Sequence, residues 1–258
     1  MKQPALFISH GAPSIAIQPS SAHQFLTKLS SYLPRLPSAI VIISPHWMTK
    51  SIKITSAAQL STIHDFGGFD ERINRLNYDI NGDPLLAQRM VELLQENKVK
   101  ASLDKHRGLD HGAWIPLMLA FPEKNIPVIQ MSMPMQSQTQ ELLNMGKILK
   151  PLRDENILIV SSGGITHNLY ELRPAGAHLS DTHWARDFSE WVHDMVSTGE
   201  IESLQDFLKN HPSARKSHPT DEHFLPLFVA LGLSGGLGQR IHSSIEYATL
   251  SMDAYLFD

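Results

Sequence analysis

The sequence predicts a single α/β domain over residues 1–258, with a mostly parallel central sheet flanked by helices. Short runs rich in Ile, Val and Leu recur without polar alternation, which is typical of strands covered on both faces. Helical patterns lie between these runs, and such alternation favours an α/β layered fold. Of the 258 residues, 42% are hydrophobic and 19% are charged. One α/β domain can reach about this length and this composition supplies a sizeable core.

Four apolar runs are expected to form the buried strands. They are Ala5–Ile8, Ala39–Ser44, Val128–Ser132 and Ile157–Ser161. A helix is expected over Pro84–Asn97, because Asp83 suits the N-cap and Pro84 the first helical position. Two other periodic stretches, Ser137–Leu149 and Thr182–Val196, also predict helices. The last segment, Tyr247–Phe257, is expected to form a strand or an edge hairpin.

Two further stretches are expected to be loops. The Pro-containing stretch Ser31–Ser38 is too short for an interdomain linker. The Gly-rich stretch Gly232–Gly238 follows a helical pattern and lacks the Gly-Lys-Ser/Thr ending of a phosphate-binding loop. A flexible loop is therefore the expectation there, with no nucleotide site.

Composition excludes several classes of function. The formal net charge is −4 and no basic run stands out, so nucleic acid is not an expected partner. The chain has no cysteine, which excludes disulfides, thiolate ligands and cysteine nucleophiles and fits a reducing compartment. The apolar run in MKQPALFISHG is too short for a signal peptide, and the longest apolar run falls well below the ~20 residues of a membrane helix. A cytoplasmic location without a membrane partner is expected.

Histidine is unusually frequent, with 14 residues, and it is the commonest metal ligand in proteins. His10 follows the strand run ALFIS, His46 follows AIVIISP, and His167 follows ILIVSSGGIT. Ligands of open α/β sheets bind outside the carboxyl ends of the strands. Because parallel strands end at the same edge, we expect these three imidazoles to lie together there, at a metal site.

A fourth candidate is His223, in the segment HPTDEH that precedes the apolar stretch FLPLFVALG. Pro219 suits the first turn of a helix, and acidic residues after it favour the positive end of the helix dipole. His218 and His223 are five residues apart and do not share a helix face. We therefore expect His223 to point inward and His218 to act as a cap or to support a ligand from behind.

A fifth candidate is His111, in the segment LDHGAW. Gly112 permits close approach of the backbone, and Trp114–Phe121 is expected to be a buried helix. Asp110 is a candidate to orient the ring of His111 or to balance its charge. A capped histidine in the core remains the alternative.

Eight motifs in order along the chain resemble those of the class III extradiol ring-cleavage dioxygenases, and most closely those of the 4,5-DOPA dioxygenase subfamily. The motifs are SHGAPS, SPHW, HDFGGF, LDHGAWIPL, IPVIQMSM, SSGGITHNL, HPTDEHFLPL and YATLSMDAYLF. They span Ser9 to Phe257 and include the five candidate ligand or catalytic histidines, His10, His46, His111, His167 and His223. The resemblance is therefore specific and covers nearly the whole chain.

The resemblance implies one mononuclear metal site. His10, His46 and His223 would be ligands, with a histidine where the wider class often has a carboxylate. His167 would be the acid/base residue and could also close a fourth metal position. His111 would line the pocket and help to hold dioxygen or substrate.

The loop from Asp65 to Asp70 is expected to form one wall of the substrate pocket, a plain surface hairpin being the alternative. The residues expected to contact the substrate are Phe66, Phe69, Asp110 and His218. The family commonly has a proline where this chain has Asp70, and residues 71–77 lack the aromatic residues often found there. These departures bear on substrate selection.

The implied reaction cleaves a catechol, DOPA-like or related, with O₂ to a muconic semialdehyde. Fe(II) is the metal this reaction needs, since zinc is redox-silent. Three imidazoles nevertheless suit Zn(II), which outranks Fe(II) in general affinity, so purified protein is expected to carry zinc. Two alternatives stay open. One is a zinc hydrolase with His167 or Glu222 as base, and the other is a metal-binding relative without turnover.

Overall fold

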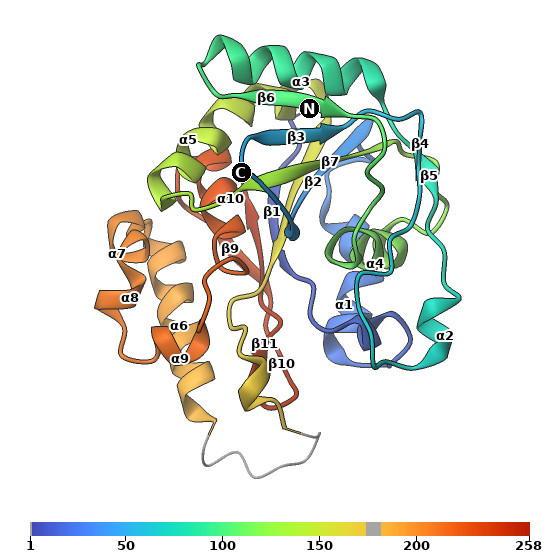
Figure 1. Ribbon diagram of the computed structural model, residues 1–258. Helices are drawn as coiled ribbons and strands as arrows, with labels where there is room; N and C mark the ends of the chain where they lie inside the picture. The colour runs from blue at the N-terminus through green and yellow to red at the C-terminus, as the bar shows by residue number, and fades with distance from the viewer. Residues whose placement is uncertain (1, 174–181) are drawn as a thin grey trace.

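An eight-stranded sheet crosses the computed structural model, which describes residues 2–173 and 182–258 (Figure 1). In spatial order its strands are β6 (Ala101–Asp104), β3 (Ile52–Thr55), β7 (Val128–Pro134), β2 (Ala39–Thr49), β8 (Ile157–Gly163), β1 (Ala5–Ser9), β12 (Ala254–Phe257) and β9 (Gln239–His242). The four central strands β7, β2, β8 and β1 run parallel, and β3 is parallel to β6. The predicted α/β class with a mostly parallel sheet is confirmed.

The four strands expected from apolar runs are the four central parallel strands, and every one extends beyond its expected end. The expectation for Tyr247–Phe257 is partly confirmed. Strand β12 lies inside the sheet, antiparallel to both β1 and β9, so it is not an edge. The residues before it form a separate ribbon of β10 (Ile245–Glu246) and β11 (Leu250–Ser251).

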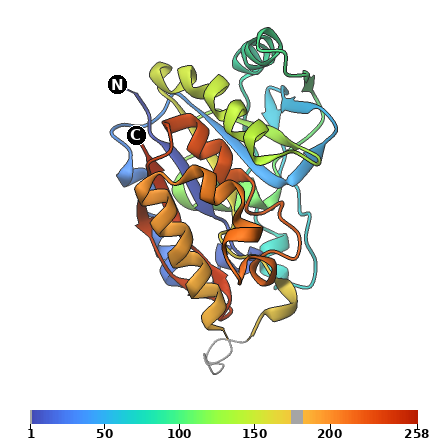
Figure 2. The ribbon, with the colours of Figure 1, turned by 90° about the vertical axis from the view of Figure 1, so that its left-hand side faces the viewer.

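Helices cover both faces of the sheet. One face packs against α3 (Pro84–Glu96), α5 (Thr139–Leu149), α6 (His183–Thr198) and α10 (Pro226–Ser234), which Figure 2 shows from their own side. The other packs against the 3₁₀ turn η1 (Pro13–Ala16), α1 (Ser21–Leu26) and α4 (His111–Ala120). Successive side chains of β1 point to opposite faces of the sheet. Phe7 therefore packs in the hydrophobic core on the first face and Leu6 in the core on the second.

Shorter elements complete the described part of the chain. They are η2 (Leu29–Tyr32), β4 (Gln59–Leu60), α2 (Glu71–Asn74), β5 (Ile80–Asn81), η3 (Lys150–Glu155), η4 (Leu169–Glu171), α7 (Ile201–Gln205), α8 (Phe207–Asn210) and α9 (Ala214–Ser217). None of the helices within the described ranges combines the length and apolarity that crossing a bilayer requires.

The predicted start of one helix is confirmed and that of another is wrong. Helix α3 begins as expected, with the Asp83 carboxylate accepting a hydrogen bond from Leu86 N at 2.9 Å. The expected start at Pro219 is wrong: residues 219–225 form turns, and α10 begins at Pro226. The expected loop at Gly232 is also wrong at its start, because α10 continues to Ser234.

Helices α5 and α10 approach closely through one glycine from each. A Cβ on Gly146 would lie 2.2 Å from Val229 O, and one on Gly232 would lie 2.1 Å from Leu143 O. Both distances are far below van der Waals contact and both neighbours are backbone atoms. The helix that follows His223 is therefore held against the core at a spacing only glycine allows.

Replacing Gly146 by Ala should lower the free energy of unfolding by about 1–3 kcal/mol, because the new methyl group must push the two helix backbones apart. Urea unfolding measures this change. Gly67→Ala is the control, since its Cβ would meet nothing within 4 Å. A Gly146→Ala protein as stable as the control would contradict the close packing.

His218 is a polar residue in the core, with 3% of its surface exposed. Its Nε2–H donates to Ile165 O at 2.8 Å, and the rings of Phe188, Phe207 and Phe224 surround it. Burial lowers the pKa of His218 to about 4. The ring is therefore neutral near pH 7 and joins the segment before α10 to the segment after β8.

The metal-free protein should lose stability as the pH falls from 6.5 toward 4. Since the pKa of His218 is near 6.5 when unfolded and about 4 when folded, protons bind preferentially to the unfolded chain in that window. The contribution of His218 should lower the free energy of unfolding by about 1.4 kcal/mol for each pH unit in this window. His218→Gln, which can still donate to Ile165 O, should flatten the pH dependence of urea unfolding by that amount. An unchanged slope would show that the ring is not held neutral.

Candidate metal centre

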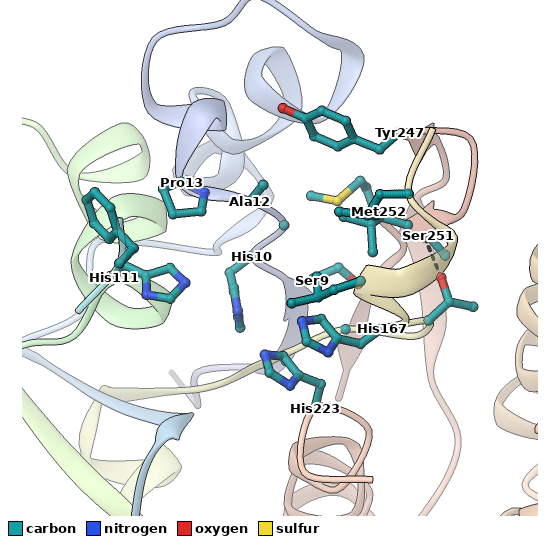
Figure 3. Close-up of a pocket in the computed structure, with 18 of the residues that line it drawn as sticks. Ser9, His10, Ala12, Pro13, His111, His167, His223, Tyr247, Ser251 and Met252 are labelled. Carbon is teal, nitrogen blue, oxygen red and sulfur yellow. Dashed lines mark hydrogen bonds between the residues drawn. The ribbon is translucent and has the colours of Figure 1, made fainter. Parts of the chain in front are cut away.

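Five histidines from separate segments meet at the carboxyl-terminal edge of the parallel strands, and Figure 3 shows His10, His111, His167 and His223 facing a common space. His10 directly follows β1, and His167 lies four residues beyond the end of β8. His223 lies in the turn before α10 and approaches from the facing side. The predicted juxtaposition at one sheet edge is therefore observed.

His46 reaches this space from a bulge inside β2, not from a loop after it. Ser44 pairs with Ser132 of β7, but the next pair is Met48 with Met133, so β2 carries three additional residues there. Such a bulge re-aims side chains locally. The bulge is anchored from behind, because Arg107 Nη2 donates to His46 O at 3.2 Å.

Three imidazoles converge closely enough to share one metal ion. Nε2 of His10 lies 3.1 Å from Nε2 of His46. One nitrogen from each of His10, His46 and His223 lies within 4.8 Å of the others. Nε2 of His223 is buried and has no hydrogen-bond partner among the described residues. A buried nitrogen without a partner is costly unless a ligand takes it.

The opposite nitrogen, Nδ1, is held in a fixed position by a neighbouring oxygen in His10 and His223. Ser162 Oγ donates to Gly112 O at 2.5 Å, so it accepts from His10 Nδ1–H at 2.9 Å. Glu222 Oε1 accepts from His223 Nδ1–H at 3.1 Å. For His46 the corresponding distance, to Asp65 Oδ2, is longer at 3.8 Å. A proton held at Nδ1 leaves the Nε2 lone pair free for a metal.

Burial keeps these rings in the neutral form that a metal requires. Desolvation, followed by repulsion from His111, lowers the pKa of His46 to about 3. The pKa values of His10 and His223 are also well below their ordinary value, first through burial and then through the neighbouring histidines. Neutral nitrogen donors that converge on one point fit a divalent transition metal.

His167 lies beside the three converging rings, stacked on His223. The ring centroids are 3.4 Å apart and the planes differ by 9°. Its backbone N–H donates to Ser217 O at 2.9 Å, and its side chain lines the cavity. Burial lowers the pKa of His167, while the charge of Glu222 opposes this shift. His167 is grouped with Glu222 and His223 as possible ligands, but not with His10 and His46.

His111 is the first residue of α4 and is held by Asp65. One Asp65 oxygen accepts from the His111 backbone N–H at 2.9 Å and from its Nδ1–H at 3.0 Å. Burial alone would raise the pKa of Asp65, but these bonds and the charge of His111 lower it to about 2. Gly112 lets α4 approach, since a Cβ there would lie 2.9 Å from His46 Cδ2.

Asp65 was missed as a site residue by sequence reasoning, which chose Asp110 as the partner of His111. Asp110 is fully buried and its carboxylate instead accepts from Gln130 Nε2, with Arg107 3.6 Å away. The signal for Asp65 lies in the motif HDFGGF, in which only Phe66 and Phe69 are predicted to contact the substrate. Asp110 and His111 are adjacent in the sequence but have different partners, because α4 starts between them.

The histidines lie in a cavity of about 610 Å³. Its described lining is Ser9, His10, Gly11, Ala12, Pro13, His46, Phe66, Gly67, Phe69, His111, Gly163, Gly164, Thr166, His167, Leu169, Leu172, His223, Tyr247, Leu250, Ser251 and Met252. The loop expected to form one wall does so through Phe66, Gly67 and Phe69. Asp70, which replaces the family's usual proline, caps α2 by accepting from Arg72 N.

Two residues expected to contact the substrate do not line this cavity. Asp110 is the buried N-cap residue of α4, and His218 is buried in the core and donates to Ile165 O. Both are buried by the elements that carry the site, so their placement disagrees with a direct substrate contact. The structure assigns them to the support of α4 and of the segment before α10.

Comparison with known proteins agrees with this geometry. The family model described as the catalytic LigB subunit of aromatic ring-opening dioxygenase matches residues 4–258. A 4,5-DOPA dioxygenase extradiol from Beta vulgaris is 36% identical over 256 residues, covering 97% of this chain and 95% of that protein. Its namesake from Escherichia coli K12 is 38% identical over 239 residues, covering 91% and 86%.

The fold also matches a solved structure. The crystal structure of an uncharacterized protein from Escherichia coli K12 superimposes with a TM-score of 0.82 at 32% identity, covering all of both chains. Family model, relatives and fold agree over nearly the whole length. The chain belongs to the LigB family of aromatic ring-opening dioxygenases and is an extradiol dioxygenase.

Proposed function

We propose that this dioxygenase cleaves a catechol beside its diol with O₂ and releases a muconic semialdehyde. One observation carries the proposal: three neutral imidazoles converge at the base of a cavity large enough for an aromatic ring. Relatives named 4,5-DOPA dioxygenase extradiol support the inclusion of catechols that carry a side chain. His10, His46 and His223 would hold the metal.

Fe(II) is the metal proposed for turnover, because when bound it supplies the electron transfer that lets O₂ react with the ring. Zn(II) would fit the same three nitrogen donors but cannot change its oxidation state. We therefore expect zinc-loaded protein to be inactive as a dioxygenase. The protein's own contribution is to keep the three rings neutral and to fix those of His10 and His223 through their Nδ1 partners.

His167 is the residue best placed to move a proton. It faces the cavity beside His223, and its lowered pKa means that the ring is neutral near pH 7 and able to accept a hydroxyl proton. His111 would orient the substrate or O₂ from the other side, with its own ring fixed by Asp65. Phe66 and Phe69 would cover the aromatic ring.

A zinc hydrolase would need Glu222 or His167 as its base. Glu222 Oε1 already accepts from His223 Nδ1 and from Thr220 Oγ1, so that oxygen serves to hold the proposed metal ligand His223.

The proposed partners are a small catechol and O₂, with neither nucleic acid nor membrane. A cytoplasmic location belongs to the same proposal and rests on the absence of cysteine.

The test is anaerobic reconstitution with Fe(II), followed by addition of catechols in an oxygen electrode. Uptake of O₂ that depends on both catechol and iron supports the proposal. Zinc-dependent hydrolysis of esters or amides without oxygen uptake would favour the hydrolase instead. Bound metal with neither reaction would indicate a relative without turnover.

Replacing His10, His46 or His223 singly by Ala should remove most of the bound metal. Each variant loses a direct ligand, and even changes around the ligands of a metal typically cost about 10–100-fold in affinity. Metal content by elemental analysis is the measurement. His106→Ala, at an exposed position away from the cavity, is the matched control. Full metal content in all three variants would exclude the assignment.

His167→Ala should keep its iron and still bind catechol, while kcat falls by roughly 10²–10⁴-fold, the usual contribution of a positioned proton-transfer group. Bound iron and oxygen uptake are measured on the same sample. A parallel fall in iron and activity would instead make His167 a fourth ligand. Normal iron with normal turnover would exclude both roles.

A further inference from the structure

One wall of the cavity is formed by the β10–β11 hairpin and the residue after it. Tyr247, Leu250, Ser251 and Met252 line the cavity from this hairpin. Figure 3 shows Tyr247 and Met252 beside the space that His10 faces. The hairpin therefore lies where a substituent of a ring bound at the histidines can reach it.

Glu246 belongs to this hairpin and projects from it on the cavity side. It pairs directly with Leu250 across the two strands, and residues paired in this way project from the same face of a ribbon. Leu250 lines the cavity. Gly11, a lining residue from the other wall, lies beside the carboxylate, since a Cβ on Gly11 would be 3.9 Å from Glu246 Oε2. Two independent contacts therefore place this carboxylate at the cavity wall.

The carboxylate of Glu246 lacks the partner that comparable groups have. Its Oε1 is buried and accepts no hydrogen bond from any described residue. By contrast, the carboxylates of Asp65 and Glu222 hold the rings of His111 and His223. A buried acceptor without a donor is costly, and more so when it carries charge. A donor with a positive charge would relieve this cost.

Among the described residues, none brings a positive charge to this carboxylate. The described lining contains no Lys or Arg side chain, and no ion pair in the described ranges involves Glu246. Arg173 is nearby, since its backbone N–H donates to Tyr247 O at 3.0 Å. Its guanidinium, however, donates to Glu171 Oε2 at 3.3 Å and to Leu172 O at 3.0 Å. A positive partner for Glu246 must therefore come with the ligand.

We propose that Glu246 determines which ring substituent the site accepts, by receiving the protonated amine of a catechol whose side chain carries one. Gly11 directly follows the proposed ligand His10, so Glu246 Oε2 lies within about 10 Å of His10 Cα. A catechol ring with a short side chain can bridge such a separation. This inference rests on the proposed ring cleavage at the histidines and names the residue that holds the other end of the substrate.

Equilibrium binding to the Zn(II)-loaded protein under anaerobic conditions tests the inference without turnover. Calorimetry compares 3,4-dihydroxyphenethylamine with 4-propylcatechol, whose side chains have the same length and differ in an ammonium or a methyl group at the end. The amine should bind about tenfold more tightly, because it forms a charge-assisted hydrogen bond with Glu246. Equal or tighter binding of 4-propylcatechol would overturn the inference, and this comparison needs no variant.

Glu246→Gln removes the charge and keeps the size of the side chain. It should weaken binding of the amine by about tenfold and leave binding of 4-propylcatechol unchanged. In the Fe(II) protein the KM for the amine should rise with little change in kcat, because Glu246 does not touch the reacting atoms. Glu123→Gln, at an exposed position outside the lining, is the matched control. Equal losses for both probes would indicate a merely structural role, and no loss would indicate no contact; either result would overturn the inference.

A third probe separates an amine from an amino acid as the source of the ammonium. 3,4-Dihydroxyphenylalanine carries the same ammonium together with a carboxylate. Tighter binding than 3,4-dihydroxyphenethylamine identifies an amino-acid substrate, and weaker binding identifies an amine. In both cases Glu246→Gln should weaken binding of the preferred probe by about tenfold, and a preferred probe that binds the variant equally well would overturn the inference.

The inference and the proposed function fail differently. If the Fe(II) protein consumes O₂ with catechols but shows no preference for an ammonium, only the role of Glu246 is overturned. If no catechol binds and none supports oxygen uptake, the proposed function and the inference fail together.

Discussion

The structure depends on holding several histidine rings close together, buried and uncharged. Nε2 of His10 lies 3.1 Å from Nε2 of His46, a separation that two protonated imidazoliums could not sustain in a poorly solvated site. Desolvation and mutual repulsion keep the rings neutral. His223 Nε2 is buried without a hydrogen-bond partner among the described residues, which leaves it available to the metal ion proposed for this cluster.

Much of the surrounding fold serves to fix these rings at their far nitrogens. The hydroxyl of Ser162, on β8, bonds both His10 and the start of α4. Glu222 holds His223, whose helix is seated on the core through the contact of Gly146 with Gly232. Asp65 holds His111 and lies near His46. Ser162, Glu222 and Asp65 come from different segments of the chain. The relative positions of the histidine rings therefore depend on how the layers of the fold pack together.

The parts of this arrangement that are local in sequence were predictable. Apolar runs identified the four central strands, since strands buried on both faces show no alternation. Parallel topology then placed His10 and His167 at one edge. The bulge that carries His46 was not predictable, because it arises from register against β7, a strand far away in the sequence. The role of Asp65 was missed for the same reason: its partner is 46 residues away.

Incorporation of ¹⁸O from ¹⁸O₂ distinguishes ring cleavage by a dioxygenase from other kinds of ring opening. The Fe(II)-loaded protein would be given a catechol under ¹⁸O₂, the aldehyde trapped by reduction, and the product analysed by mass spectrometry. Cleavage beside the diol by a dioxygenase places one oxygen atom in the carboxylate and one in the aldehyde, so the account predicts two ¹⁸O atoms in each ring-opened product. A ring-opened product with no ¹⁸O, or a labelled product formed equally well after His10→Ala, would contradict it.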